Sequence, residues 1–191
     1  MSRTVAVVLA NEPGSGFSGS KFLVDVGGGP LIDRVLADIS RWPVDDTVVV
    51  LGPDAEEILQ GMEPTDATVV MDLEWSEGSA ASLRVGRAVV RRGTPADLGA
   101  IALADQPGVG AEDVEALIDA ASDASASVPK YRYRRGFPVV LERSIWERLL
   151  GAEGDLDLLD LLESHPEGVQ EVWFEHLSGP RIRTPDDIRQ R

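Results

Sequence analysis

A continuous apolar segment near the start of the chain, residues 4–10, limits most narrowly the folds that this sequence can adopt. Its apolar side chains do not alternate with polar ones, which is typical of a strand covered on both faces in a parallel sheet. The segment runs directly into a loop rich in glycine and serine, residues 11–21. Ligands of open α/β sheets bind beyond the carboxyl ends of the strands, so this loop is the first candidate site.

After this first strand, predicted helices and strands alternate along the chain. Apolar spacing predicts helices over residues 31–39, 55–60, 79–91 and 112–121, and short apolar runs predict strands over residues 47–51, 68–71 and 99–103. The alternation predicts an α/β fold with a Rossmann-like, doubly wound and mostly parallel sheet.

The last third of the sequence is less regular. It predicts strands over residues 127–133, 139–141 and 169–174, and helices over residues 145–150 and 157–163. These elements suggest a small antiparallel annex beside the parallel sheet. At this length we expect residues 1–191 to form a single domain.

Composition excludes several classes of function. The chain has 18 basic and 33 acidic side chains, a net charge of −15, and this balance disfavours binding to nucleic acid. It has no cysteine, which excludes disulfides and thiolate zinc sites. No apolar run approaches the roughly 20 residues that span a bilayer. We therefore expect a cytoplasmic protein that binds neither nucleic acid nor membrane, with its oligomeric state left open.

Two charged residues follow predicted strands at the ligand-binding edge of the sheet. Lys21 ends the glycine- and serine-rich loop, where backbone N–H groups and a lysine can bind phosphate. Asp105 follows the strand at 99–103, where a carboxylate can hold a Mg²⁺ that bridges phosphates. The alternatives are a flexible loop with a solvated lysine and an aspartate that only forms a turn or caps a helix.

Three further motifs have both a functional and a structural interpretation. Small residues at 76–82 form either a cradle for an anion or a simple helix cap. The basic segment 130–135 is either a docking site for an anionic acceptor or a solvated edge strand, and strand alternation predicts Arg132 and Arg134 on one face with the tyrosines on the other. Asp155 is either a second metal ligand or a helix cap. We interpret His165 and His176 as surface or packing residues.

Taken in order, these motifs resemble the MobA-like nucleotidyltransferase family over nearly the whole chain, and most closely its molybdenum cofactor cytidylyltransferases. The family motif L-[AG]-D-Q-P is intact at residues 103–107. The stretch G-x-x-x-S-L-x-x-G is matched by Gly78, Ser82, Leu83 and Gly86. Weaker matches are the loop at residues 9–21, the segment at 28–32, and the glycines of the later motifs at 136–139 and 154–155.

The resemblance implies a nucleotide-diphospho-sugar transferase (GT-A-like) fold. It also implies transfer of a nucleoside monophosphate from a Mg²⁺-bound nucleoside triphosphate to a phosphorylated small-molecule acceptor such as molybdopterin, with release of pyrophosphate. Lys21 and Asp105 would then be catalytic. The implied nucleotide-binding residues are Leu9, Ala10, Gly14, Ser15, Gly19, Lys21, Gly78 and Ser82; the acceptor-binding residues are Gly136, Phe137 and Pro138; and the metal ligands are Asp105 and Asp155.

The chain departs from the family pattern at charged positions. Glu12 replaces a loop glycine, Gly16 a loop arginine, and Phe137 a histidine. Arg181 and Arg183 replace the two leading acids of a D-x-D-T-P-E-D motif near the end. The loop changes at Glu12 and Gly16 favour an alternative function, in which the chain binds a nucleotide, a cofactor or a partner protein without catalysing transfer. The retained Lys21 and Asp105 favour transfer. A third hypothesis is that the two arginines supply a positive charge that the loop has lost.

Overall fold

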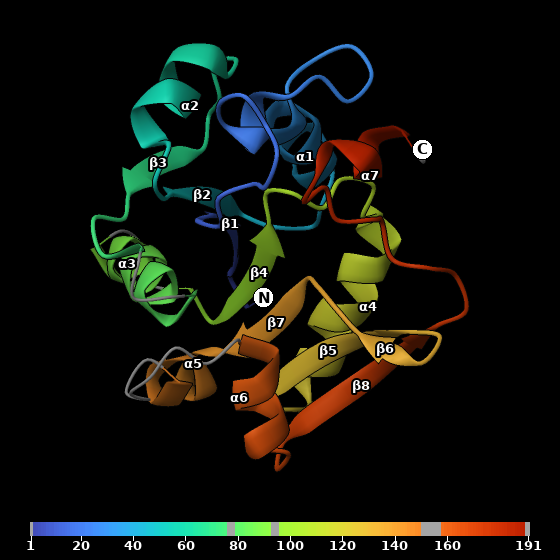
Figure 1. The fold of residues 1–191 in the computed structure, drawn as a ribbon. Helices are drawn as coiled ribbons and strands as arrows, with labels where there is room; N and C mark the ends of the chain where they lie inside the picture. Colours follow the sequence, from blue (N-terminus) through green and yellow to red (C-terminus); the bar gives the residue numbers. More distant parts are fainter. Residues whose placement is uncertain (1, 76–78, 93–95, 150–157, 190–191) are drawn as a thin grey trace.

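One mixed sheet organises the part of the chain that the computed structural model describes, residues 2–75, 79–92, 96–149 and 158–189 (Figure 1). Its strands lie in the order β3-β2-β1-β4-β7-β5-β6, and β8 pairs with β5. The strands are β1 (Thr4–Ala10), β2 (Asp46–Leu51), β3 (Thr68–Met71), β4 (Leu98–Leu103), β5 (Ala126–Tyr131), β6 (Arg134–Arg135), β7 (Val139–Glu142) and β8 (Val169–Phe174).

The first half of the sheet is parallel, as the apolar runs predicted. β1 lies at its centre and pairs in parallel with β2 on one side and β4 on the other, and β3 pairs with β2. Every residue of β1 is buried, which explains why its sequence does not alternate between apolar and polar side chains.

The second half confirms an annex but corrects its details. β7 is antiparallel to β4 and β5, whereas β8 runs parallel to β5, so the annex is itself mixed. The strand predicted over residues 127–133 ends at Tyr131, because the chain turns at Arg132, whose φ is 57°. The predicted alternation of arginines and tyrosines is therefore wrong: Tyr131 is buried and Tyr133 is 85% exposed.

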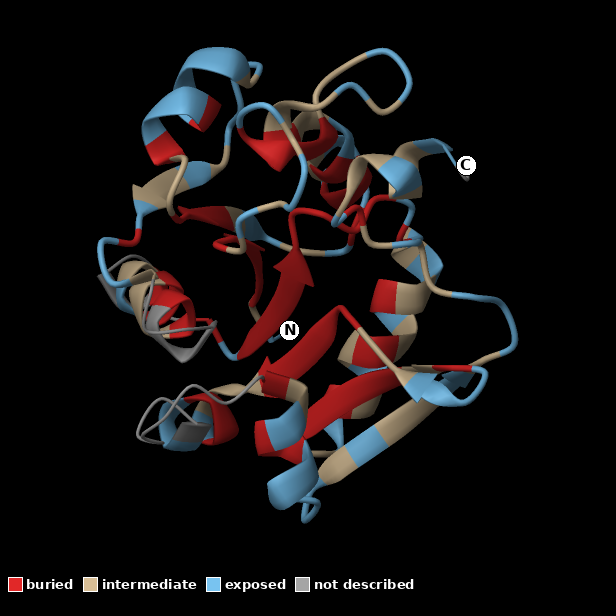
Figure 2. Cartoon of the chain, viewed as in Figure 1, coloured by how far each residue is buried: buried red, intermediate tan, exposed pale blue. Residues whose placement is uncertain are grey.

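Helices cover both faces of the sheet, and the core lies on each side of it (Figure 2). Alternate residues of β1 face opposite ways: Val5, Val7 and Leu9 pack in one cluster, and Ala6, Val8 and Ala10 in the other. The helices are α1 (Leu31–Ile39), α2 (Ala55–Gly61), α3 (Ser79–Arg92), α4 (Ala111–Ser122), α5 (Arg143–Leu149), α6 (Leu158–Ser164) and α7 (Pro185–Arg189), with a 3₁₀ turn η1 (Lys21–Leu23). None of the helices in the described ranges has the length and apolarity to cross a membrane.

The order of the strands defines where a ligand can bind. From β1 the chain proceeds to β2 on one side, while β4 lies on the other side, so the strand order reverses between β1 and β4. A crevice outside the carboxyl ends of the strands at such a reversal is the usual ligand site of open α/β sheets. We call this edge, at the carboxyl ends of β1 and β4, the rim. In Figure 1, β4 points toward η1, α1 and α7, which lie around the rim.

Candidate functional site

The two residues singled out in the sequence, Lys21 and Asp105, meet at the rim. The Lys21 ammonium Nζ donates a hydrogen bond to Asp105 Oδ2 at 2.7 Å. Both side chains are buried, with 1% and 2% of their surface exposed. The proximity that the hypothesis required is therefore present, and the pair lies below the surface.

A third residue, Arg181, lies over this pair. Its Nε donates to Asp105 Oδ1 at 2.9 Å, and its Nη2 donates to Asp105 Oδ2 at 2.9 Å. The same Nη2 donates to Glu12 Oε2 at 2.7 Å. We call Glu12, Lys21, Asp105 and Arg181 the rim cluster. Its two positive and two negative side chains make it formally neutral.

The backbone of the segment after β8 holds Arg181 in place. The N–H of Ile182 donates to the carbonyl oxygen of Asp105 at 2.8 Å, and the Ile182 side chain is fully buried in the core. The N–H of Ser15 donates to the carbonyl oxygen of Arg183 at 3.2 Å. This segment therefore bridges the end of β4 and the loop after β1.

The rim cluster fixes the charge of Asp105. Burial raises the pKa of the Asp105 carboxyl, but the hydrogen bonds and positive charges of Arg181 and Lys21 more than offset that effect. The net pKa lies below its ordinary value, so Asp105 is an ionised carboxylate at neutral pH. In this geometry its carboxylate accepts hydrogen bonds from two cations.

The glycine-rich loop folds back onto the lysine that ends it. A Cβ atom on Gly14 would lie 2.6 Å from the Cβ of Lys21, so only glycine lets the loop pass over the lysine stem. Gly19 has a φ of +117°, a conformation that favours glycine, and a Cβ there would lie 2.8 Å from Glu57 Oε1. Packing on Lys21 thus explains Gly14, whereas backbone conformation and the nearby Glu57 explain Gly19.

The predicted nucleotide residues of β1 and α3 lie close to the rim. Leu9 and Ala10 end β1, and their carbonyl oxygens accept hydrogen bonds from the N–H groups of Ala104 and Gly52. The hydroxyl of Ser82 accepts a hydrogen bond from Asn11 Nδ2 and donates to Asp72 Oδ2 at 2.6 Å, in a buried chain. Gly78, predicted to contact the nucleotide, lies outside the described residues.

A cavity of about 590 Å³ opens beside the rim, at the carboxyl ends of β2 and β3. Its lining includes Gly52, Glu57, Asp72 and Trp75. The acidic side chains in this lining disfavour phosphate, whereas polar atoms beside an indole ring suit a nucleoside.

The predicted acceptor turn lies on the other side of Asp105. Gln106 Nε2 and the Tyr131 hydroxyl both donate to the carbonyl oxygen of Phe137 at 3.3 Å, which ties this turn to the residue after Asp105. Phe137 is 8% exposed and packs in the core, so its ring replaces the family histidine with an apolar group. A Cβ atom on Gly136 would lie 3.2 Å from the ring of Tyr131, and Pro138 lines a narrow gap next to Gln106.

The carboxylate oxygens at the rim are not free to serve as ligands of the predicted Mg²⁺. Divalent cations of this kind need several free oxygen ligands, but both oxygens of Asp105 already accept hydrogen bonds from cations. Glu12, the other carboxylate of the cluster, is bound to the same Arg181. In the described ranges, no group of three or more His, Cys, Asp or Glu residues is placed to hold a metal ion. Asp155, the second predicted ligand, lies outside these ranges.

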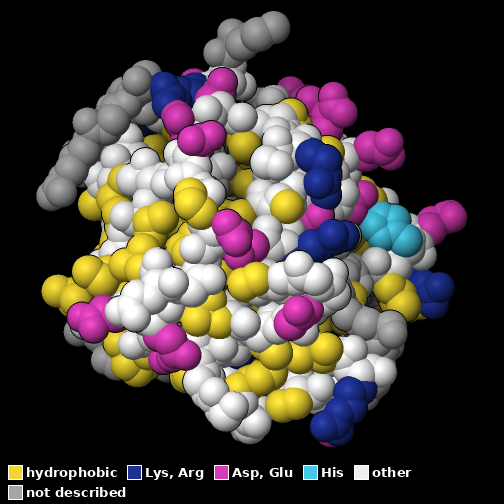
Figure 3. All heavy atoms as spheres, turned by 90° about the horizontal axis from the view of Figure 1, so that it is seen from above, with side chains coloured by type: hydrophobic (Ala, Val, Ile, Leu, Met, Phe, Trp, Pro, Cys, Tyr) yellow, Lys and Arg dark blue, Asp and Glu magenta, His cyan; other side chains and the backbone are white. Residues whose placement is uncertain are grey.

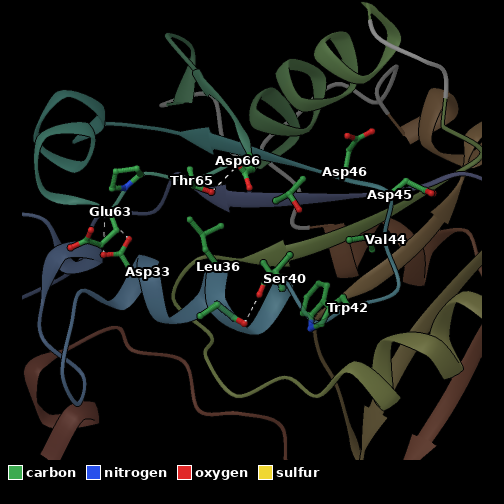
Figure 4. A pocket seen from close by; sticks show the side chains of 15 residues that line it. Asp33, Leu36, Ser40, Trp42, Val44, Asp45, Asp46, Glu63, Thr65 and Asp66 are labelled. Carbon is green, nitrogen blue, oxygen red and sulfur yellow. Dashed lines mark hydrogen bonds between the residues drawn. The ribbon is translucent and has the colours of Figure 1, made fainter.

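A second hollow, of about 480 Å³, has the wrong charge for a triphosphate (Figure 4). It lies between α1, the start of β2 and the segment before β3, and its lining includes Asp33, Asp45, Asp46, Glu63 and Asp66. Burial raises the pKa of Asp33, against a lowering hydrogen bond from the N–H of Glu63. Five carboxylates repel a polyanion, so the rim is the better candidate site.

The rim side of the molecule has no broad basic surface in the part that the structure describes. Figure 3 looks from the side toward which β4 points, and its basic side chains are scattered among acidic and hydrophobic ones. A ligand with several negative charges therefore depends on a few well-placed cations. Of the predicted docking segment, Lys130 and Arg135 are both bound to Glu171 in the annex, while Arg132 and Arg134 are exposed.

The sequence placed Glu12 in the loop and raised Arg181 and Arg183 as replacements for its lost positive charge, but it paired neither Glu12 nor Arg181 with Asp105. The structure joins Arg181 to both acids. Arg181 lies 76 residues from Asp105 and 169 residues from Glu12 along the chain, so no local pattern pairs them. The available signal was the alternation Arg181-Ile182-Arg183, which marks an extended segment with its apolar residue inward.

Comparison with known proteins identifies the family and the fold of this chain. The model of the MobA-like NTP transferase domain matches residues 6–169. A solved Rv0371c homologue from Mycobacterium sp. strain JC1 is 28% identical, with a TM-score of 0.86 over 98% of this chain and 94% of that one. No curated protein matches the sequence.

Two further solved structures share the fold. Rv0371c of Mycobacterium tuberculosis H37Rv, in a complex with manganese, is 23% identical, with a TM-score of 0.83 over 98% of this chain and 97% of that one. Molybdopterin-guanine dinucleotide biosynthesis protein A from Archaeoglobus fulgidus is 24% identical, with a TM-score of 0.72 over 97% and 95%. The predicted nucleotidyltransferase fold is thus confirmed, and the chain belongs to the MobA-like NTP transferase family.

Proposed function

We propose that this chain binds a nucleoside triphosphate at the rim and transfers its nucleoside monophosphate to a phosphorylated small molecule, with molybdopterin as the first acceptor to test. The observation that carries the proposal is the convergence of Lys21 and Arg181 on Asp105 where the strand order reverses. In a chain of net charge −15, Arg181 is the partly exposed cation of this cluster, and it would be the group that a phosphate contacts.

The available hydrogen-bond donors support this function. Arg181 uses its Nε and Nη2 within the rim cluster, and its two Nη1 N–H groups have no hydrogen-bond partner among the described residues. A fifth of the Arg181 side chain is exposed. The guanidinium is therefore fixed on one side and available on the other, the form in which arginine recognises phosphate.

The reaction requires positioning and charge neutralisation more than covalent catalysis. An oxygen of the acceptor phosphate forms a bond to the α-phosphorus, the bond from that phosphorus to the bridging oxygen breaks, and pyrophosphate leaves with the electron pair. Arg181, with Lys21 beneath it, would offset the negative charge that develops on the phosphoryl oxygens. The cavity beside Trp75 would take the nucleoside, and the turn at Gly136, Phe137 and Pro138 would face the acceptor.

A second candidate function, nucleotide binding without transfer, is favoured by one contact. Glu12 lies on Arg181 at 2.7 Å, so an incoming phosphate must compete with a carboxylate for the same guanidinium. A weak or slow site of this kind suits a protein that binds a nucleotide and passes it to a partner.

Two measurements test the proposal. Calorimetric titration with CTP, GTP and ATP should detect binding of at least one, and Arg181→Gln should weaken that binding by at least about tenfold, since a charged hydrogen bond contributes about 1.5–3 kcal/mol. The matched control is Arg135→Gln, which removes an arginine from the annex and should leave binding unchanged. Circular dichroism establishes that both variants are folded.

Pyrophosphate release then separates the two functions. Release on addition of molybdopterin or another phosphorylated acceptor supports transfer. Nucleotide binding with no release from any acceptor supports the second candidate function. If none of the three nucleotides binds the folded protein, both functions are wrong.

A further inference from the structure

We infer that Arg181 takes the place of a divalent cation at Asp105, so that this chain binds phosphate at the rim without a metal ion. The inference deepens the proposed function, and only its nucleotide measurement rests on that function. It starts from the hydrogen bonds of one carboxylate. Asp105 accepts one bond from Lys21 and two from Arg181, all between 2.7 and 2.9 Å.

These bonds leave Asp105 little capacity for a metal. A carboxylate has about four lone-pair sites, and three of those on Asp105 are occupied by charged donors. The carboxylate is also 98% buried, since only 2% of its side chain is exposed. A cation would have to displace the guanidinium of Arg181, which is also bound to Glu12. The next residue, Ile182, ties the backbone of this segment to the carbonyl oxygen of Asp105.

The net charge of the rim cluster also disfavours a divalent cation. Lys21 and Arg181 carry two positive charges against the two negative charges of Asp105 and Glu12, so the cluster is already neutral. A divalent cation added to it would lie beside two like charges, which is unfavourable in a buried site. A guanidinium offers a phosphate positive charge and directional N–H donors. These can replace the charge and the directed coordination of a metal ion.

Paramagnetic broadening in nuclear magnetic resonance tests the inference without a nucleotide. Mn²⁺ added alone to the full chain broadens amide signals near any site where it binds. We expect the amides of Gln106 and Ile182, which flank the rim cluster, to lose no more intensity at a given Mn²⁺ concentration than the amide of Leu98 at the far end of β4. Selective broadening of Gln106 and Ile182 in the unaltered protein would overturn the inference.

A charge-reversal variant provides the gain-of-function control. Arg181→Asp replaces the guanidinium with a second carboxylate beside Asp105, and Mn²⁺ should then broaden Gln106 and Ile182. Arg183→Asp makes the same charge change at an exposed position two residues away and should keep the unaltered pattern. A folded Arg181→Asp variant that gains no broadening contradicts the inference. If that variant does not fold, the unaltered protein still decides the question.

Nucleotide titration in the presence of a chelator supplies the second readout. The affinity for the nucleotide that binds best should agree within about threefold between EDTA and excess Mg²⁺, after allowance for free Mg²⁺ binding to the nucleotide itself. Affinity that is lost in EDTA would contradict metal-free binding. If no nucleotide binds in either buffer, the proposed function fails, and the Mn²⁺ experiment still tests Arg181.

Discussion

A carboxylate bound to a lysine and an arginine occurs both at the rim and in the annex, in two different surroundings. At the rim, Asp105 lies between Lys21 and Arg181; in the annex, Glu171 lies between Lys130 and Arg135. The separations are nearly equal, 2.7–2.9 Å in both places. The exposed fraction differs: 2% for Asp105 and 25% for Glu171.

This difference shows that burial, and not the length of the hydrogen bonds, decides what an ion pair does for the protein. Water near Glu171 screens its charges and can replace a lost partner, so the annex pairs contribute little. Nothing replaces a lost partner of Asp105, because a buried charge without a partner is costly. The rim cluster is therefore both a candidate phosphate site and a point where the fold is vulnerable.

The largest expected effect comes from neutralising the buried carboxylate. Asp105→Asn leaves Lys21 buried beside a neutral amide, and the free energy of unfolding should fall by about 3–5 kcal/mol. Urea denaturation followed by circular dichroism measures this change. A loss below about 1 kcal/mol would show that the interior of the rim admits water, and the contrast with the annex would then break down.

A smaller effect is expected in the pH dependence of stability. The folded pKa of Asp105 lies below that of an unfolded aspartate, about 3.9, so its ionised form stabilises the fold above that pH. This contribution is lost as the pH falls through the lower, folded pKa. Urea denaturation at a series of pH values below about 5 should therefore show a flatter profile for Asp105→Asn than for the unaltered protein. Parallel profiles would mean that other carboxylates govern acid unfolding.

The smallest effect is expected in the annex. Hydrogen bonds from Lys130 and Arg135 lower the pKa of Glu171 against a smaller, opposing effect of burial. Glu171→Gln should reduce the free energy of unfolding by less than about 1 kcal/mol, and added salt should reduce the difference further. The same urea experiment at low and high salt measures both values. A loss as large as that of Asp105→Asn would mean that the two ion pairs of Glu171 are as well shielded from water as the rim.

Much of the fold follows from periodicity in the sequence. The helix at residues 31–39 and the strand at 68–71 were predicted with the bounds that the structure shows. The apolar residues of the helix lie on one face, and those of the strand form one short continuous run. The turn at Arg132 was not predicted, because a left-handed residue other than glycine leaves no pattern in composition. The short helix α7 was also missed, since five residues give too few turns for a period to appear.

Within the site, the sequence alone determined that a lysine after β1 and an aspartate after β4 would share an edge of the sheet, because parallel strands bring their carboxyl ends together. Only the tertiary structure decided what surrounds them. Arg181 and Glu12 come from opposite ends of the chain, and the distance between them depends on how the segment after β8 crosses the rim. The path of this segment decides whether the buried carboxylate can bind a metal ion or is bound to a guanidinium, because Arg181 lies far from Asp105 in the sequence.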